Sequence, residues 1–257
     1  MFVGMRLKRP VLIVLMTLGL GYAAIVGAAF NFQRALIFPA PTRAREPHHG
    51  LVRGAGFVAM HFPGSPTIVH LHGNAEQLAD SEWLAGKFVE RGFGFYAVEY
   101  PGYGLSAATP VSEEAIYATV EAALIALEKS VPKDQLILQG QSLGSGIAVE
   151  MARRGHGSKL MLVAPYTSIP EVAAAAMPFL PGRLLVRDQF NSAAKASAVT
   201  LPVLLVHGSD DEVIPIRMSQ TLAKLFPNAT LRIVPGAHHN DLIDRPEVLE
   251  ALATFAR

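Results

Sequence analysis

The 257-residue sequence contains no cysteine. This absence excludes disulfides, Cys-ligated zinc, iron–sulfur clusters and a cysteine nucleophile. It says little about the compartment, because a chain without thiols is compatible with both reducing and oxidising environments. Charged residues are also scarce, at 17% of the chain with a net charge of +1, and no long basic run is present. The sequence therefore lacks the electrostatic footprint of a nucleic-acid-binding protein.

Apolar residues are abundant instead, at 51% of the chain, which is enough for a large buried core. The length fits one sizeable domain preceded by a leader. We predict that residues 1–30 are an N-terminal signal anchor or signal peptide, that 31–50 form a proline-containing connector, and that 51–257 form one α/β domain. Within this domain, the irregular stretch 165–201 is expected to be a small cap-like insertion.

The N-terminal segment carries an uncharged apolar run, residues 11–30, of about the length that a helix needs to cross a bilayer. Arg6, Lys8 and Arg9 precede the run, and only Arg34 follows it closely. The positive-inside rule then places the domain on the non-cytoplasmic side, periplasmic or extracellular. We favour a single-pass anchor. The alternatives are a cleaved signal peptide, which would give a secreted domain, and a buried core helix, which would usually show a polar face.

From Leu51 onward, apolar runs alternate with helical patterns. Strands are expected at 51–62, 67–72, 94–100, 135–139, 160–164, 203–207 and 230–234, and helices at about 78–91, 112–129, 142–154, 171–177, 217–226 and 244–255. Continuous apolar strands that alternate with helices indicate a mostly parallel sheet with helices on both faces. Functional sites in such sheets form at the carboxyl ends of the strands.

A G-x-S-x-G motif, Gly140–Gly144, directly follows the strand 135–139 and opens a helix. The glycines leave room where Cβ atoms would collide, and the helix N-terminus favours negative charge beside Ser142. This context predicts a nucleophile elbow with Ser142 as the nucleophile. The competing interpretation is a glycine-rich turn without a function. The sequence has neither a dinucleotide fingerprint nor a phosphate-binding P-loop, and we expect no cofactor.

A serine nucleophile needs a base and an acid that orients the base. His239 lies after the last expected strand, with His238 as its competitor, and Asp210 and Asp211 follow the strand 203–207. The chain order serine, aspartate, histidine is typical of α/β-hydrolases. From the residues alone either aspartate could be the acid, and the other could cap the next helix.

The segment His70–Asn74 ends the strand 67–72. Its H-x-H pattern could suggest a metal site, but further ligands do not accompany it, and we expect no metal. We interpret the segment as an oxyanion-hole loop. The two N–H donors would be those of Leu143 and Asn74, with Ala75 as an alternative to Asn74. Glu99 is expected to hold a neighbouring loop.

These motifs together resemble the α/β-hydrolase superfamily and its serine-aminopeptidase-like branch, which includes small membrane-anchored hydrolases and membrane-associated depalmitoylating enzymes. The segments that carry the resemblance are FQRALIFPAP, HLHGNAE, YPGYGLS, GQSLGSG, PVLLVHGSDDEVIP and GAHHND. The resemblance implies the α/β-hydrolase fold, with Asp211 as the acid and His239 as the base. The chain departs from the family at Glu99 and Pro101, where the family often has Asp and Arg. It also lacks the cysteine cluster of the animal depalmitoylating members.

The expected function is therefore that of a serine hydrolase. Ser142, Asp211 and His239 would cleave a small acyl ester, thioester or lipid-like substrate through an acyl-enzyme. The alternatives are a serine aminopeptidase or an acyltransferase with the same triad, or a catalytically silent membrane-tethered binding protein. The insertion 165–201 is short for a lid, which suggests an open site.

Overall fold

The computed structural model describes residues 9–41 and 43–257. Arg6 and Lys8, on which the predicted orientation of the leader partly depends, lie outside the described residues.

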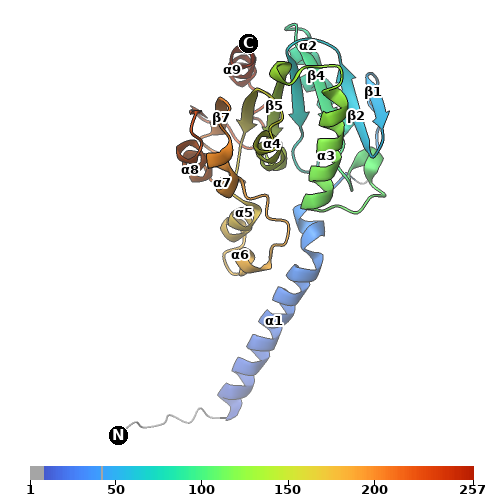
Figure 1. The fold of residues 1–257 in the computed structure, drawn as a ribbon. Coiled ribbons are helices and arrows are strands. Elements are labelled where there is room, and N and C mark those ends of the chain that lie inside the picture. The colour runs from blue at the N-terminus through green and yellow to red at the C-terminus, as the bar shows by residue number, and fades with distance from the viewer. Residues whose placement is uncertain (1–8, 42) are drawn as a thin grey trace.

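One eight-stranded sheet runs through the domain in the order β1-β2-β4-β3-β5-β6-β7-β8 (Figure 1). The strands are β1 (Leu51–Gly54), β2 (Phe57–Phe62), β3 (Thr67–Leu71), β4 (Gly94–Val98), β5 (Leu136–Gln141), β6 (Lys159–Val163), β7 (Val203–Gly208) and β8 (Ala229–Val234). β2 pairs antiparallel with β1 and β4, and every other pairing in the sheet is parallel. The predicted mostly parallel sheet is confirmed. The run 51–62 is two strands, because the chain turns at Gly56, whose φ of 82° suits glycine.

Helices cover both faces of the sheet and bury two separate apolar clusters. The principal helices are α2 (Glu82–Val89), α3 (Glu113–Leu127), α4 (Leu143–Arg153), α8 (Arg217–Leu225) and α9 (Pro246–Ala256), and short 3-10 turns lie at η1 (Leu78–Ser81), η2 (Gly104–Ser106), η3 (Lys133–Gln135) and η4 (Ala196–Ala198). α3, α4 and α8 contribute to one cluster, whereas α2 and α9 contribute to the other. The sheet is therefore buried on both sides, which explains its unbroken apolar strands.

A single long helix, α1 (Arg9–Ile37), projects from the domain (Figure 1). Its mean hydropathy over the most apolar window is 2.3, and no part of that window is buried, so by length and composition it could cross a membrane. Its 29 residues span about 44 Å. The helix continues through residues 31–37, which were expected to begin the connector, and it stops just before Pro39. This end point is consistent with the tendency of proline to terminate helices.

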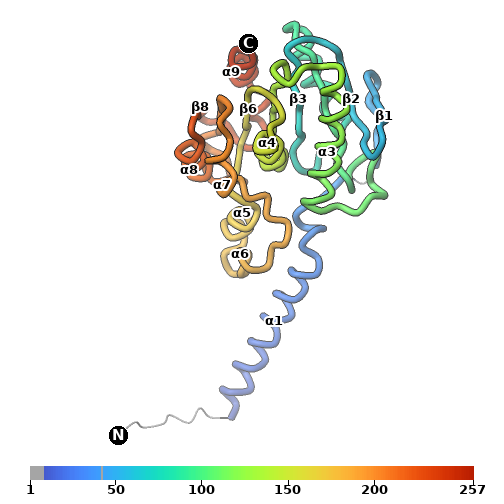
Figure 2. The backbone as a smooth tube through the Cα atoms, in the orientation of Figure 1, coloured from blue at the N-terminus to red at the C-terminus, as the bar shows by residue number. Residues whose placement is uncertain are grey.

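The insertion expected at 165–201 contains three short helices, α5 (Ile169–Ala176), α6 (Gly182–Leu185) and α7 (Ser192–Lys195). α5 and α6 lie beside the upper part of α1 in the tube view (Figure 2). Gln33 on α1 donates from Nε2 to the carbonyl of Leu185 over 3.1 Å, and Arg34 pairs with Asp188 at 2.9 Å. The insertion and the last turns of α1 therefore hold each other in place.

Candidate active site

Ser142 occupies the turn between β5 and α4. Its backbone has φ 48° and ψ −116°, a conformation that non-glycine residues rarely adopt. Glycines on either side allow this turn: a Cβ on Gly140 would collide with the carbonyl of Gly144, and a Cβ on Gly144 would collide with that of Leu71. The turn places the Ser142 hydroxyl beyond the end of the sheet, at the N-terminus of α4.

Three side chains from different loops meet at this turn. His239 Nε2 lies 3.0 Å from Ser142 Oγ, and His239 Nδ1 lies 2.8 Å from Asp211 Oδ2. The structure thus brings together Ser142, Asp211 and His239. It places the two competitors elsewhere, because Asp210 accepts a hydrogen bond from Ser209 in an exposed turn and the exposed His238 faces Glu212.

The Asp211 carboxylate is fully buried and held by several donors. The N–H groups of Val213 and Ile214 donate to its Oδ1 over 2.9 and 2.7 Å. Burial opposes ionisation, but the hydrogen bonds from His239 and from these N–H groups outweigh it and lower the pKa of Asp211 below its usual value. The carboxylate is therefore charged at neutral pH and fixes the orientation of the imidazole.

The two residues whose backbone N–H groups were predicted as oxyanion donors, Leu143 and Asn74, line the same cavity as Ser142. Leu143 is the first residue of α4, so its N–H has no partner within the helix. The backbone N–H of Asn74 makes no hydrogen bond to another described residue. The Asn74 side chain is locked instead: Nδ2 donates to the carbonyl of Ile37 over 2.5 Å, and Oδ1 accepts from Tyr103 Oη over 2.5 Å. The end of α1 therefore holds the loop that carries Asn74.

Glu76 belongs to this loop and was not singled out from the sequence. Its Oε2 accepts from the Gly73 N–H over 3.0 Å, and its Oε1 lies 3.4 Å from the amide nitrogen of Gln141. Burial raises the pKa of Glu76, against the opposing effects of His72 and of the Gly73 N–H. In the sequence, the clue to Glu76 was its position two residues after Asn74 in HLHGNAE. Only the fold shows that its side chain faces Gln141, beside Ser142.

A buried cluster supports the loop from behind. His72 Nε2 lies 3.6 Å from Glu99, both side chains are fully buried, and the His72 ring stacks on Tyr100. Glu99 also accepts hydrogen bonds from the N–H groups of Leu78 and Leu105, both over 3.2 Å. Burial lowers the pKa of His72, but the hydrogen bond and charge of Glu99, together with Glu76 and the Gly73 carbonyl, outweigh this effect and raise it. Glu99 thus has the loop-holding contacts that were expected.

The two histidines of the H-x-H pattern face different partners. His70 Nδ1 pairs with the amide oxygen of Gln139, while His72 faces Glu99. Within residues 9–41 and 43–257, no group of three or more His, Asp or Glu side chains is arranged to hold a metal ion.

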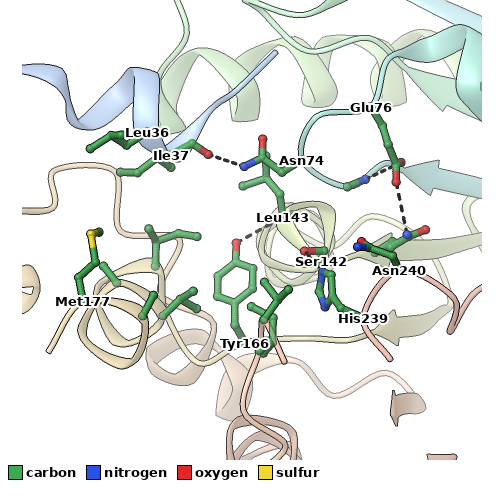
Figure 3. A pocket seen from close by; sticks show the side chains of 18 residues that line it. Leu36, Ile37, Asn74, Glu76, Ser142, Leu143, Tyr166, Met177, His239 and Asn240 are labelled. Atoms are coloured by element: carbon green, nitrogen blue, oxygen red, sulfur yellow. Dashed lines mark hydrogen bonds between the residues drawn. The ribbon is translucent and has the colours of Figure 1, made fainter. Parts of the chain in front are cut away.

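A cavity of about 370 Å³ opens over Ser142 and His239 (Figure 3). Its polar end contains these two residues with Asn74, Glu76, Gln141 and Asn240, and its other walls are mostly apolar. Much of this apolar wall comes from α5 with its C-cap residue and, unexpectedly, from the end of α1: Leu36, Ile37, Val172, Ala173, Ala176 and Met177. The insertion is short, as expected, but together with α1 it encloses one side of the site.

Family comparisons agree with this architecture. A family described as serine aminopeptidase, S33, matches residues 64–192, half of the chain, and one described as alpha/beta hydrolase fold matches residues 169–246. An uncharacterized protein of Mycobacterium tuberculosis is 31% identical over 212 residues, which cover 79% of this chain and 75% of the relative. The chain is therefore an α/β-hydrolase. Within that superfamily it belongs to the serine aminopeptidase family.

Two animal relatives are longer than the matched region. The alpha/beta hydrolase domain-containing protein aho-3 of Caenorhabditis elegans is 35% identical over 195 residues, or 74% of this chain and 57% of the relative. The alpha/beta hydrolase domain-containing protein 17C of Xenopus tropicalis is 34% identical over 198 residues, or 75% of this chain and 62% of the relative. The chain thus spans little more than half of these relatives.

Solved structures show the same fold. An esterase from Exiguobacterium antarcticum superposes with a TM-score of 0.64 at 18% identity, covering 81% of this chain and 99% of the esterase. The monoacylglycerol lipase of Paleococcus ferrophilus gives a TM-score of 0.60 at 18% identity, covering 78% of this chain and 98% of the lipase. At this identity the likeness establishes the architecture, and the substrate must be argued from the site.

Proposed function

We propose that the protein is a membrane-anchored serine hydrolase that cleaves acyl esters or thioesters. The observation that carries this proposal is the hydrogen-bonded series Asp211–His239–Ser142 at the polar end of an apolar cavity. A serine hydroxyl becomes a useful nucleophile only with an adjacent, oriented base, and this arrangement supplies one.

The reaction would proceed in two halves. Ser142 Oγ attacks the substrate carbonyl while His239 Nε2 takes its proton, and the N–H groups of Leu143 and Asn74 stabilise the oxyanion. When the tetrahedral intermediate collapses, the leaving alcohol or thiol receives that proton from His239. Water then attacks the acyl-enzyme with His239 again as base, which releases the carboxylic acid and restores Ser142. Asp211 stays ionised throughout and stabilises the imidazolium.

The walls of the cavity favour an ester with an apolar acyl group. The side chains of α1 and α5 that line it are aliphatic or thioether groups, which interact well with an alkyl chain. The names of the two structural neighbours, an esterase and a monoacylglycerol lipase, are consistent with such substrates.

Labelling of the full-length chain in detergent with a fluorophosphonate probe tests the proposal. We expect the wild type to be labelled and Ser142→Ala to be unlabelled, with parallel loss of p-nitrophenyl butyrate hydrolysis. A folded wild type that resists the probe would contradict the proposal and support the alternative of a catalytically silent binding protein.

A serine aminopeptidase is the second candidate, and Glu76 is the observation that favours it. This carboxyl group lines the cavity near Ser142 and could pair with a substrate amine. Its existing hydrogen bonds to Gly73 and Gln141 give it a structural role as well. Turnover of aminoacyl p-nitroanilides distinguishes the two functions: an aminopeptidase would cleave them and lose that activity in Glu76→Gln, whereas an esterase would leave them intact.

The location that we propose follows from α1. The helix would anchor the protein in the membrane, with the catalytic domain on the non-cytoplasmic side. A signal peptide cleaved within the apolar run remains the alternative, and it would release the domain.

A further inference from the structure

A second, narrow cleft continues the cavity away from the catalytic side chains. It lies between α1 and the α5–α6 insertion, and four residues line both spaces: Leu36, Ile37, Ala173 and Met177. Figure 3 shows Leu36, Ile37 and Met177 at the end of the cavity remote from Ser142 and His239. The cleft is therefore an extension of the space in which the substrate carbonyl would react.

The lining of the cleft is apolar. Nine of its ten lining residues are aliphatic, methionine or glycine, and the one polar residue is Gln33. The Gln33 amide is already occupied, because its nitrogen donates to the carbonyl of Leu185 and its oxygen accepts from the Arg187 N–H over 2.7 Å. The site thus suits an alkyl chain and offers little to a polar group.

The cleft also lies next to the membrane-spanning part of α1. Tyr22, in the middle of the apolar run, donates from its hydroxyl to the carbonyl of Phe179 in the α5–α6 connection over 2.8 Å. Tyr22 lies about 12 Å along the helix from residue 30, so the insertion extends beside the apolar segment. Phe179 and Leu184 in this region are 65% and 86% exposed. Large exposed apolar side chains beside a membrane-spanning helix are well placed to enter the lipid.

We propose that this cleft is the acyl-chain subsite, and that it receives the alkyl chain of a bilayer-resident ester or thioester directly from the membrane. The chain would lie between α1 and α5–α6 while its carbonyl reaches Ser142. This inference rests on the proposed hydrolase function and adds the substrate class, an amphiphile with a medium or long acyl chain. From Ala29 to Ile37 the cleft follows about 12 Å of α1, so several methylene groups can be buried.

Chain-length selectivity tests the subsite. We would compare the rates at which an ethyl and a dodecyl fluorophosphonate label the full-length chain in nanodiscs. Ala173→Phe fills the point where cavity and cleft join, while Ala175→Phe is a matched control on the same helix, because Ala175 is exposed and lines neither space. Each methylene group of the probe that the cleft buries raises the labelling rate by up to about fourfold.

In Ala173→Phe we expect the dodecyl-to-ethyl rate ratio to fall at least about tenfold, and the ratio cancels any change that affects both probes alike. Ala175→Phe should keep the wild-type ratio. Circular dichroism spectra and melting curves show separately whether Ala173→Phe is folded. An unchanged ratio in Ala173→Phe would overturn the subsite, whereas failure of both probes on the wild type would instead overturn the hydrolase proposal.

A second measurement does not need a reactive serine. Palmitic acid with a terminal diazirine is photolysed with Ser142→Ala in nanodiscs, and the labelled peptides are identified by mass spectrometry. We expect label on Met177 and Leu180 themselves, distinguished by fragmentation from the lipid-exposed Phe179, and its loss from these two residues when Ala173→Phe, but not Ala175→Phe, is added. Equal labelling of Met177 and Leu180 in both double variants would contradict the subsite.

Discussion

At the scale of single residues, the neighbouring aspartates Asp210 and Asp211 differ in the burial of their side chains. Asp211 is fully buried, accepts two backbone N–H bonds and contacts His239. Asp210 is one residue away in an exposed turn and accepts from a serine hydroxyl. A buried carboxylate stabilises the imidazolium that forms during the reaction far better than one exposed to solvent, because the local dielectric constant is lower.

The matched pair Asp211→Asn and Asp210→Asn tests this assignment. Asp211→Asn should lower kcat for p-nitrophenyl butyrate by roughly 10²- to 10⁴-fold, because the amide no longer holds the correct imidazole tautomer. Asp210→Asn should change kcat by less than about twofold, as expected of a surface substitution. Steady-state kinetics with melting curves for both variants make the comparison. A larger defect in Asp210→Asn would mean that the acid is wrongly assigned.

His70 predicts a specific pH dependence of stability. Burial lowers the pKa of this histidine from 6.5 to about 4, against the opposing effect of its hydrogen bond to Gln139. The folded state then keeps His70 neutral where the unfolded chain binds a proton. The stability that the folded protein gains by burying neutral His70 is fully present above pH 6.5, and it is lost as the pH falls from 6.5 toward about 4.

Urea unfolding between pH 7 and pH 4 measures this effect. The wild type should lose up to about 1.4 kcal/mol of unfolding free energy per pH unit through His70 in that range. His70→Gln should show a shallower slope, even if its stability at pH 7 is lower. Parallel slopes for the two proteins would show that His70 is not the titrating group.

At the scale of elements, the last turn of α1 is part of the wall of the candidate active site. Leu36 and Ile37 line the cavity, and the Ile37 carbonyl holds the Asn74 side chain. An apolar anchor would need only the run 11–30. In a membrane-anchored protein, the extra turns to Ile37 would therefore couple the anchor to the loop that carries a proposed oxyanion donor. Removing these turns should affect catalysis as well as membrane attachment.

Two truncations separate these roles. A chain lacking residues 1–30 keeps Leu36 and Ile37 and should retain hydrolysis of p-nitrophenyl butyrate. A chain lacking residues 1–40 should lose at least about tenfold in kcat/KM, because the Asn74 loop loses its anchor. If the hydrogen bond between the Asn74 side chain and the Ile37 carbonyl accounts for this loss, Asn74→Ala should lower kcat/KM in the chain that lacks residues 1–30. The same substitution should then add little to the defect of the chain that lacks residues 1–40. Additive defects would show that the two act independently.

From the sequence alone, three strand-to-loop motifs could be predicted to lie together at one end of the sheet: Gly140–Gly144, His207–Asp211 and Gly236–His239. Parallel strands bring their carboxyl ends together, which is why this prediction was possible. The contact of Leu36 and Ile37 with α5 could not be predicted, since it joins segments more than 130 residues apart and no local periodicity encodes it. Likewise, the prolines made residues 31–50 look irregular throughout, although a helix can continue up to the residue before the first proline.

At the scale of the whole molecule, the position of α1 sets the position of the site. The helix leaves the domain beside α5 and α6 (Figure 1), and its residues Leu36 and Ile37 line the cavity. Leu36 lies about 9 Å along the helix axis from residue 30, where the apolar run ends. If α1 crosses the bilayer, the cavity stands at the membrane surface. The side of the membrane on which it stands then determines which substrates and leaving groups the enzyme meets.

The absence of cysteine makes this side directly measurable, because each introduced thiol is the only one in the chain. Pro10 and Lys133 are both exposed, one at the start of α1 and the other on the domain surface. The reagent is a membrane-impermeant maleimide applied to intact cells. Lys133→Cys should be labelled directly, whereas Pro10→Cys should be labelled only after the cells are permeabilised. The reason is that the basic residues before the apolar run favour the cytoplasm. The reverse pattern would place the domain inside. A shortened Pro10→Cys protein that never reacts would reveal cleavage of the leader, and the domain would then depend on its exposed α5–α6 region for any contact with lipid.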